Sequence, residues 1–168
     1  MPNTQSKDEV LNKFRGYLKN AGLAIADEDS NKPWGAYFVI DPAAADIFIK
    51  AYFPDFPLNQ LSKHDNRLST KFLVVAPGKR MSWQYHHHRA ELWRVVSGPV
   101  GVCASPTDDQ PDTKQLEIDQ TIQFDALVRH RLIGLENWGV IAEIWQHNDP
   151  ARPSDESDIV RVQDDYGR

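Results

Sequence analysis

The stretch that decides the fold is PGKRMSWQYHHHRAELWRVVSG, which runs from Pro77 to Gly98. It contains three consecutive histidines, and Glu91 follows three positions after the last of them. Imidazole and carboxylate side chains are common ligands of Zn²⁺ and other transition metals. The stretch therefore indicates a metal site, but the histidine run by itself leaves open which side chains would hold the ion.

The chain that follows Thr70 has the texture of a β-rich protein. Short segments rich in Val, Ile, Trp and Phe are separated by turn residues such as Pro77 and Gly78. The segments are KFLVVAPGKRMSWQY, ELWRVVSGPVGVCAS, KQLEIDQTIQF, VRHRLIGLEN and GVIAEIWQH. Many short strands without alternating helices predict an all-β (β-rich) fold, a small antiparallel jelly-roll barrel.

Two helices are expected before the barrel and packed outside it. The first lies in SKDEVLNKFRGYLKNAG, and the second follows Asp41, which can cap it. The residues expected to face the core are Val10, Leu11, Phe14, Tyr17 and Leu18 in the first helix and Ile47, Phe48, Ala51 and Tyr52 in the second. We expect a single domain overall, with residues 1–69 as an N-terminal helical extension and 70–168 as the barrel and its C-terminal tail. Within that tail, residues 159–162 are apolar enough to add a last strand.

The composition argues against several classes of protein. A net charge of −5, from 19 basic and 24 acidic residues, argues against a general nucleic-acid binder. No segment approaches the roughly 20 consecutive apolar residues that span a membrane. The polar start MPNTQSKDEV lacks the apolar core of a signal peptide, and the single cysteine, Cys103, allows no disulfide within the chain. We therefore expect a cytoplasmic protein that binds neither nucleic acid nor membrane.

The quoted stretch resembles the first motif of the cupins, small jelly-roll barrels with a metal in the mouth. In that motif a glycine, two histidines, a glutamate and a second glycine recur at fixed spacings. Counted from Gly78, the spacings fall on Gln84, His86, Glu91 and Gly98, with glutamine in place of the usual first histidine. The resemblance implies that Gln84, His86 and Glu91 are metal ligands.

The resemblance leaves His87 and His88 outside the set of ligands. Side chains of a strand alternate between its two faces, so residues 84 and 86 share one face and His87 points to the other. Residues 87–90 are then expected to form a turn, after which Glu91 returns on the neighbouring strand and faces the same cavity.

The fourth ligand is expected from VRHRLIG, whose His130 corresponds to the histidine of the second cupin motif. Asp125 and Leu127 stand where that motif usually has proline and glycine. The other candidates are weaker, because His64 lies in a polar stretch before the barrel and His147 follows the last strand in an exposed-looking segment. One amide oxygen, two imidazoles and one carboxylate suit one divalent metal, Zn²⁺ first, with Fe, Mn or Co as alternatives.

Longer blocks resemble the type II mannose-6-phosphate isomerase family, a domain that commonly ends two-part enzymes of GDP-mannose synthesis. The blocks are KPWGAYFVI, APGKRMSWQYHHHRAELWRVVSG, RHRL and DIVRVQDDYGR. The resemblance implies a metal-dependent aldose–ketose isomerase of a sugar phosphate, with mannose 6-phosphate and fructose 6-phosphate as the pair. Guanylyl transfer is not expected, because the chain has no Gly-rich phosphate-binding loop. The segment 42–69 departs from the usual domain and leaves the sugar open.

Residues that would handle the substrate follow from the same blocks. Arg89, between the ligands His86 and Glu91, is expected to act in catalysis and in holding the phosphate, because a guanidinium binds phosphate oxygens in pairs. Further substrate-binding residues are expected at Lys79, Arg80 and Arg168. His88 is the candidate for proton transfer, since histidine titrates near neutral pH, and its alternative role is to orient a ligand.

Three other functions stay open at this point. The chain could isomerise another phosphosugar, such as a heptose phosphate. It could be a non-catalytic cupin module that binds a sugar or a sugar phosphate. It could also be an Fe-dependent oxygenase, although glutamine in place of the first histidine disfavours that. A homodimer is expected as well, because an open barrel leaves sheet edges to cover.

Overall fold

A computed structural model of the chain describes residues 4–57 and 68–168. Its helices are α1 (Lys7–Asn20), the short 3-10 helix η1 (Pro42–Ala44) and α2 (Ala45–Tyr52). Its strands are β1 (Ile25–Asp29), β2 (Gly35–Ile40), β3 (Leu68–Val75), β4 (Trp83–Tyr85), β5 (Arg89–Ser97), β6 (Val100–Ser105), β7 (Lys114–Leu116), β8 (Thr121–Phe124), β9 (Arg129–Gly134), β10 (Gly139–His147) and β11 (Val160–Gln163). None of the described helices is long and apolar enough to cross a membrane.

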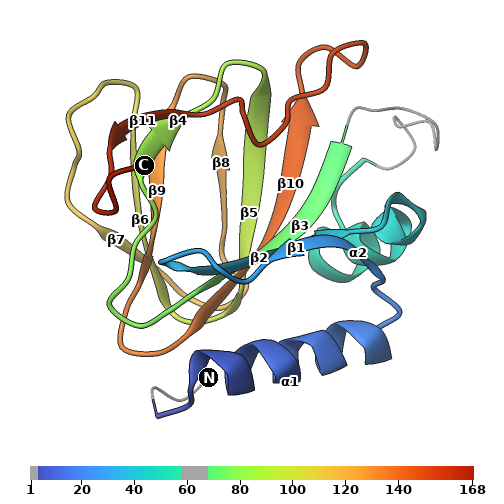
Figure 1. The fold of residues 1–168 in the computed structure, drawn as a ribbon. Coiled ribbons are helices and arrows are strands. Elements are labelled where there is room, and N and C mark those ends of the chain that lie inside the picture. The colour runs from blue at the N-terminus through green and yellow to red at the C-terminus, as the bar shows by residue number, and fades with distance from the viewer. Residues whose placement is uncertain (1–3, 58–67) are drawn as a thin grey trace.

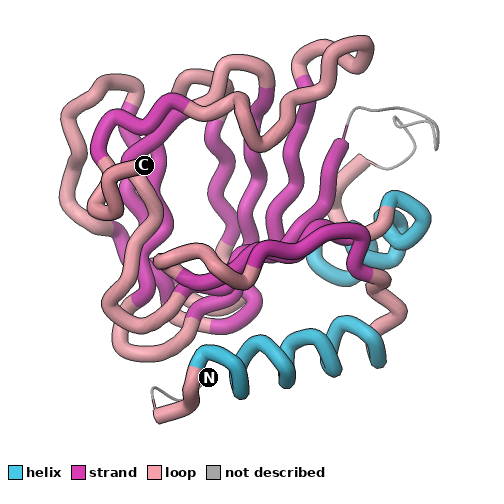
Figure 2. Tube along the Cα trace, viewed as in Figure 1, coloured by secondary structure: helices cyan, strands magenta, loops and turns pink. Residues whose placement is uncertain are grey.

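The strands form two antiparallel sheets that face each other (Figures 1 and 2). The first has the order β1-β2-β3-β10-β5-β8, and the second has the order β11-β4-β9-β6-β7. The β-rich antiparallel barrel predicted from the sequence is confirmed. The last strand also forms as expected, because β11 pairs with β4 at the open end of the second sheet.

The first sheet is covered on both faces, which gives the molecule two apolar layers. Val140, Ala142 and Ile144 of β10 pack with the helices, whereas Ile141 between them packs toward the second sheet. This alternation is the ordinary consequence of the two-residue period of a strand. The interior side of β10 therefore also receives Glu143, a position that matters for the site below.

Both helices lie on the outer face of the first sheet, as predicted (Figure 1). Ser6 and Glu9 form a reciprocal capping box at the start of α1, and the Asp41 side chain accepts a hydrogen bond from the Ala43 N–H at the start of η1. The predicted face of α2 was partly wrong, because Ile47 is 49% exposed and Ala51 is exposed as well, whereas Ile49 is buried. The helix is turned by its contact with the sheet, which brings Ile49 inward beside Phe48.

The segment expected as a helical extension also supplies β1 and β2. The pattern of β1, IADED, is polar because it is an edge strand, so its sequence carries little strand signal. β2 pairs with β3, and a Cβ added at Gly35 would lie 1.8 Å from the carbonyl oxygen of Val74. Only glycine allows this close approach of the two backbones. Tyr17, expected in the core, is 45% exposed, and its hydroxyl contacts that of Tyr52.

We predict that Phe72 of β3 fixes both helices to the sheet. Its ring centroid lies 5.3 Å from that of Phe14, 5.0 Å from that of Phe48 and 5.2 Å from that of Tyr52. Phe72→Ala should lower the free energy of unfolding in urea by about 3–5 kcal/mol. Ile47→Ala on the exposed side of α2 is the control and should change it by less than about 0.5 kcal/mol. Equal effects of the two substitutions would contradict this packing.

Candidate metal centre

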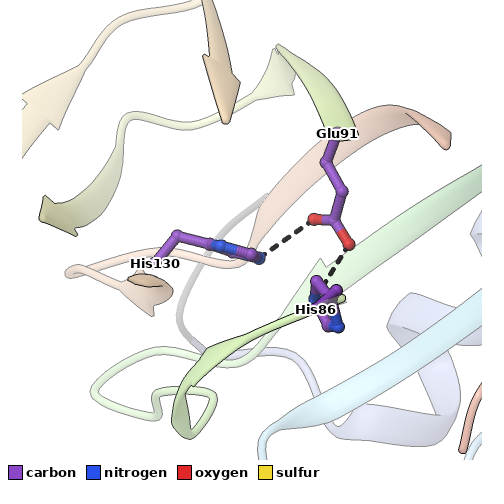
Figure 3. A group of neighbouring side chains, drawn as sticks. All are labelled: His86, Glu91 and His130. Carbon is purple, nitrogen blue, oxygen red and sulfur yellow. Dashed lines mark ion pairs between the residues drawn. The ribbon is translucent and has the colours of Figure 1, made fainter. Parts of the chain in front are cut away.

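Three buried side chains from different strands converge inside the barrel (Figure 3). His86 follows β4, Glu91 lies in β5 and His130 lies in β9. The Nε2 atom of His86 is 3.1 Å from Glu91 Oε1, and the Nε2 atom of His130 is 3.1 Å from Glu91 Oε2. All three residues are 2% exposed. Three of the four ligands predicted from the sequence therefore lie together.

Strand pairing explains why these positions meet. Gln84 is directly opposite His130 across the β4–β9 pair, and His86 is two residues further along the same face. In β5 the buried residues alternate, so Arg89, Glu91 and Trp93 all point to the interior. The spacing of Gln84, His86 and Glu91 in the sequence therefore brings all three side chains to the interior, from β4, from the turn after it and from β5.

Both histidines have the tautomer that a metal ligand needs. The Nδ1 atom of His86 is 2.6 Å from the carbonyl oxygen of Asp158, and that of His130 is 2.9 Å from the carbonyl oxygen of Val128. Because a carbonyl oxygen only accepts, each Nδ1 carries a hydrogen, so the neutral form of each imidazole has its lone pair on Nε2, on the side of Glu91. The Nε2 atom of His130 is buried without a hydrogen-bond partner. A cation between these atoms would satisfy all of them, so the residues present fit a divalent metal.

Gln84 borders this centre with its side-chain amide. Its Nε2 atom is 3.5 Å from His86 Nε2, while its Oε1 atom accepts a hydrogen bond of 2.5 Å from the Ser82 hydroxyl. Half a turn of the amide exchanges these two atoms, and the Ser82 hydroxyl can donate or accept in either state. The amide oxygen of Gln84 can therefore face the centre without losing its bond to Ser82.

Arg89 reaches into the centre from the start of β5. Its guanidinium donates to Glu91 Oε1 at 2.9 Å and to the Ser154 hydroxyl at 2.8 Å, and it stacks over the Trp145 ring at 3.5 Å. The Nη2 atom of Arg89 is also 3.2 Å from His86 Nε2. Arg89 is 4% exposed, so its charge acts in a poorly solvated interior.

Charge around Glu91 decides its ionisation. Burial on its own would raise the pKa of Glu91, but His86, His130 and Arg89 outweigh burial and hold that pKa well below its ordinary value. Burial lowers the pKa of His86, which favours the neutral imidazole that binds metals. Glu91 is thus anionic and lies beside the Arg89 guanidinium and two imidazoles.

Glu143 is a residue that sequence reasoning missed. Its Oε1 atom accepts a hydrogen bond of 2.9 Å from Trp93 Nε1, which lies 3.2 Å from Glu91 Oε2 as well. Its Oε2 atom is buried with no hydrogen-bond partner, and burial, together with the charge of Glu91, raises its pKa well above the ordinary value. The sequence does carry a sign of this residue, since Glu143 is an acid in the middle of the apolar run GVIAEIWQH. A carboxyl group is costly to bury without partners, so an acid in a buried strand indicates a specific role.

Gln84, Arg89, Glu91 and Glu143 line one narrow cavity of about 50 Å³. The rest of the cavity wall carries mostly positive charge, although the protein as a whole is acidic. Besides Arg89, its basic residues are Lys32, Lys71, Arg161 and Arg168. A larger cavity of about 640 Å³ lies against the end of α2 and the outer face of β5, and none of the three converging side chains lines it. We place the candidate site at the smaller cavity because Glu91, whose carboxylate lies against both imidazoles, lines it.

The predicted substrate-binding residues divide into two groups. Arg168 lines the cavity and is held by the Asp164 carboxylate, with Nη2 3.0 Å from Oδ1. Arg80 is bound to Asp165 with Nε 2.6 Å from Oδ2, and Lys79 is exposed. Neither Arg80 nor Lys79 lines this cavity, although both anchor or flank the C-terminal segment beside it.

The remaining histidines lie elsewhere. His88 is exposed and lines a separate outer cavity with Asp158, so the structure does not bring it to the converging ligands. His147 was wrongly expected to be exposed after the last strand. It ends β10, is 9% exposed, and contacts the Ser69 hydroxyl at 2.9 Å through Nε2. His64 lies outside the described residues.

Comparison with known proteins adds a family and relatives. Residues 44–164 match the family described as "Mannose-6-phosphate isomerase C-terminal". A mannose-1-phosphate guanylyltransferase of Salmonella montevideo is 28% identical over 165 residues, covering 98% of this chain and 28% of that protein. The alginate biosynthesis protein AlgA of Pseudomonas aeruginosa is 32% identical over 176 residues, covering 98% of this chain and 30% of that protein. The chain thus spans less than a third of the length of these relatives.

Solved structures agree on the fold. KdgF from Halomonas sp. has a TM-score of 0.51 at 11% identity, over 78% of this chain and 89% of that chain. Recombinant oxalate oxidase in complex with glycolate has a TM-score of 0.52 at 15% identity, over 80% of this chain and 58% of that chain. At these identities the likeness shows the fold alone, which is a cupin.

We predict that the chain binds about one Zn²⁺ through His86, Glu91 and His130. His130→Ala should weaken binding more than about 100-fold, because it removes a ligand outright, whereas loss of a residue that only supports a ligand costs about 10- to 100-fold. His87→Ala is the matched control, because His87 is exposed and faces away. Elemental analysis and competition with a chelator measure both variants. Equal metal content in His130→Ala and the unaltered protein would place the metal elsewhere.

Proposed function

Because the chain belongs to the mannose-6-phosphate isomerase C-terminal family, we propose that it isomerises a sugar phosphate, with mannose 6-phosphate and fructose 6-phosphate as the expected pair. The observation that carries the proposal is the convergence of two imidazole Nε2 atoms on the carboxylate of Glu91, which also lines a cavity with a cationic wall. The guanylyl transfer named in the first relative is not part of it, because the chain spans only 28% of that protein.

The reaction moves a proton between C1 and C2 of the open-chain sugar through an enediolate. His86, Glu91 and His130 would hold the metal, and Gln84 would join them through its amide oxygen. When bound, a divalent ion supplies a Lewis acid that stabilises negative charge on the oxygens of C1 and C2. Zn²⁺ is our first choice and Fe, Mn and Co are alternatives, because nitrogen and oxygen donors suit all four.

Two residues are candidates for the proton transfer. His88 was proposed from the sequence, but it is exposed and lines the outer cavity. Glu143 lines the same cavity as Glu91 and has a carboxyl oxygen without a partner, which supports it as the group that takes or returns the proton. Arg89, which already contacts Glu91, would add positive charge beside the developing enediolate.

We predict turnover of mannose 6-phosphate to fructose 6-phosphate by metal-loaded protein. In Gln84→Ala the bound metal and the turnover should both fall, by about tenfold or more if the amide oxygen is a ligand. Gln115→Ala, on the exposed part of β7, is the control with the same chemical change. Retained metal and sugar binding without turnover would favour a binding module, and turnover of another phosphosugar alone would change the substrate.

A second prediction separates the two candidates for proton transfer. Glu143→Gln keeps the size of the side chain and its hydrogen bond from Trp93, but it cannot exchange a proton. Its kcat should fall by about 10²- to 10⁴-fold with unchanged metal content. His88→Ala should leave kcat near that of the unaltered protein. The opposite outcome, with His88→Ala inactive and Glu143→Gln active, would return the role to His88.

A further inference from the structure

A lysine that no motif pointed to lies in the wall of the metal cavity. Lys71 of β3 is 4% exposed and stands directly opposite Glu143 across the β3–β10 pair. Its ammonium lies 4.4 Å from the centroid of the Tyr37 ring and 4.1 Å from that of the Trp145 ring. Aromatic faces stabilise a cation but do not replace the hydrogen-bond acceptors that a buried ammonium loses from water. Lys71 therefore needs an anion close by.

The anion in this structure is supplied from an exposed turn. Glu156 Oε1 lies 2.5 Å from Lys71 Nζ, and the Glu156 side chain is 54% exposed, against 5% for Lys71. Glu156 thus stabilises Lys71 while its own carboxylate remains largely in water. Another anion can therefore replace Glu156 beside Lys71. The displaced Glu156 carboxylate would stay in water, so the exchange buries no unpaired charge.

The turn that carries Glu156 belongs to a strap, residues 148–159, which crosses the end of the barrel from β10 to β11 (Figure 1). The strap is fixed on either side of Glu156. The Ser154 N–H donates to His147 Nδ1 at 2.9 Å, and the Asp158 carboxylate accepts from the N–H groups of His87 and His88 at 2.9 and 3.0 Å. The backbone of the turn is therefore held in place, and the Glu156 side chain is the part that can leave.

A hydrogen-bond donor without a partner lies beside Lys71. Trp145 Nε1 is buried with no hydrogen-bond partner, on a ring that lines the same cavity. An N–H donor next to an ammonium is suited to the oxygens of a phosphate. Three of the other cavity cations have carboxylate partners, because Arg89 is bound to Glu91, Arg168 to Asp164 and Lys32 to Asp29, and Arg161 is exposed rather than buried.

We propose that Lys71 is the residue that binds the anionic group of the substrate, and that the carboxylate of Glu156 occupies this position until a phosphate displaces it. The inference rests on the proposed function for the identity of the substrate as a sugar phosphate. Glu156 is one of the residues that line this cavity of about 50 Å³. Entry of the substrate would require Glu156 to swing away from Lys71.

The test uses metal-loaded protein and inorganic phosphate as the probe, with binding followed by titration calorimetry. Lys71→Met removes the ammonium and should weaken phosphate binding by roughly tenfold or more. Glu156→Gln removes the competing charge and should tighten it by several-fold. In the double variant the effect of Glu156→Gln should disappear, because its target is gone. Lys114→Met and Glu136→Gln, two exposed positions with the same chemical changes, should leave binding unaltered.

The outcomes separate this inference from the proposed function. If mannose 6-phosphate is isomerised but phosphate binding ignores both Lys71→Met and Glu156→Gln, the inference fails and the function stands. If no phosphosugar is isomerised but phosphate binding responds as expected, the anion site stands and the isomerase proposal fails. Glu156→Gln keeps the size of the side chain and an amide oxygen that can accept a hydrogen bond from Lys71, and circular dichroism checks that the variant is folded. Weaker phosphate binding by folded Glu156→Gln would by itself overturn the displacement.

Discussion

The buried Glu91 carboxylate requires positive charge or hydrogen-bond donors on every side, and much of the barrel is arranged around that requirement. Arg89 and Trp93 donate to its two oxygens from the same strand, and two imidazoles approach from the opposite sheet. A buried carboxylate without such partners would be protonated or would destabilise the fold. The centre therefore depends on the register between β5 and its neighbours, since a slip of one residue would turn Glu91 away from the interior.

The first sheet is covered on both faces, and the apolar contacts on its outer face compensate for the polar side chains on its inner face. The helices bury the outer face of β3 and β10 with an apolar layer that contains Phe72 and Ile144. The inner face can then hold Lys71, Glu143 and Glu91 without leaving the sheet short of apolar contacts. A second apolar cluster, which contains Trp93 and Phe124, packs between the two sheets. The outer face of these strands is thus apolar, whereas their inner face carries both apolar and charged side chains.

The sequence predicted the parts of the site that follow from spacing along one or two strands. The resemblance to the cupin motif picked out Gln84, His86 and Glu91, and the alternation of side chains along a strand agrees with that choice. Glu143 and Lys71 could not be placed, because their burial comes from neighbours distant in sequence, with β3 between β2 and β10. The strand β1 was missed for a related reason, since an edge strand need not be apolar. Ile47 was misplaced because two adjacent helical stripes fit the same residues, and contact with Phe72 selects between them.

The strap joins the metal ligands to the mouth of the cavity through a small set of polar contacts. The carbonyl oxygen of Asp158 fixes the tautomer of His86, while the carboxylate of the same residue holds the backbone of His87 and His88. Ser154 bonds both Arg89 and Asp158. A strap that opened as a whole would therefore release His86 from its ligating orientation. Movement confined to the Glu156 side chain avoids this, because it uncovers Lys71 while the contacts that orient His86 and Arg89 stay intact.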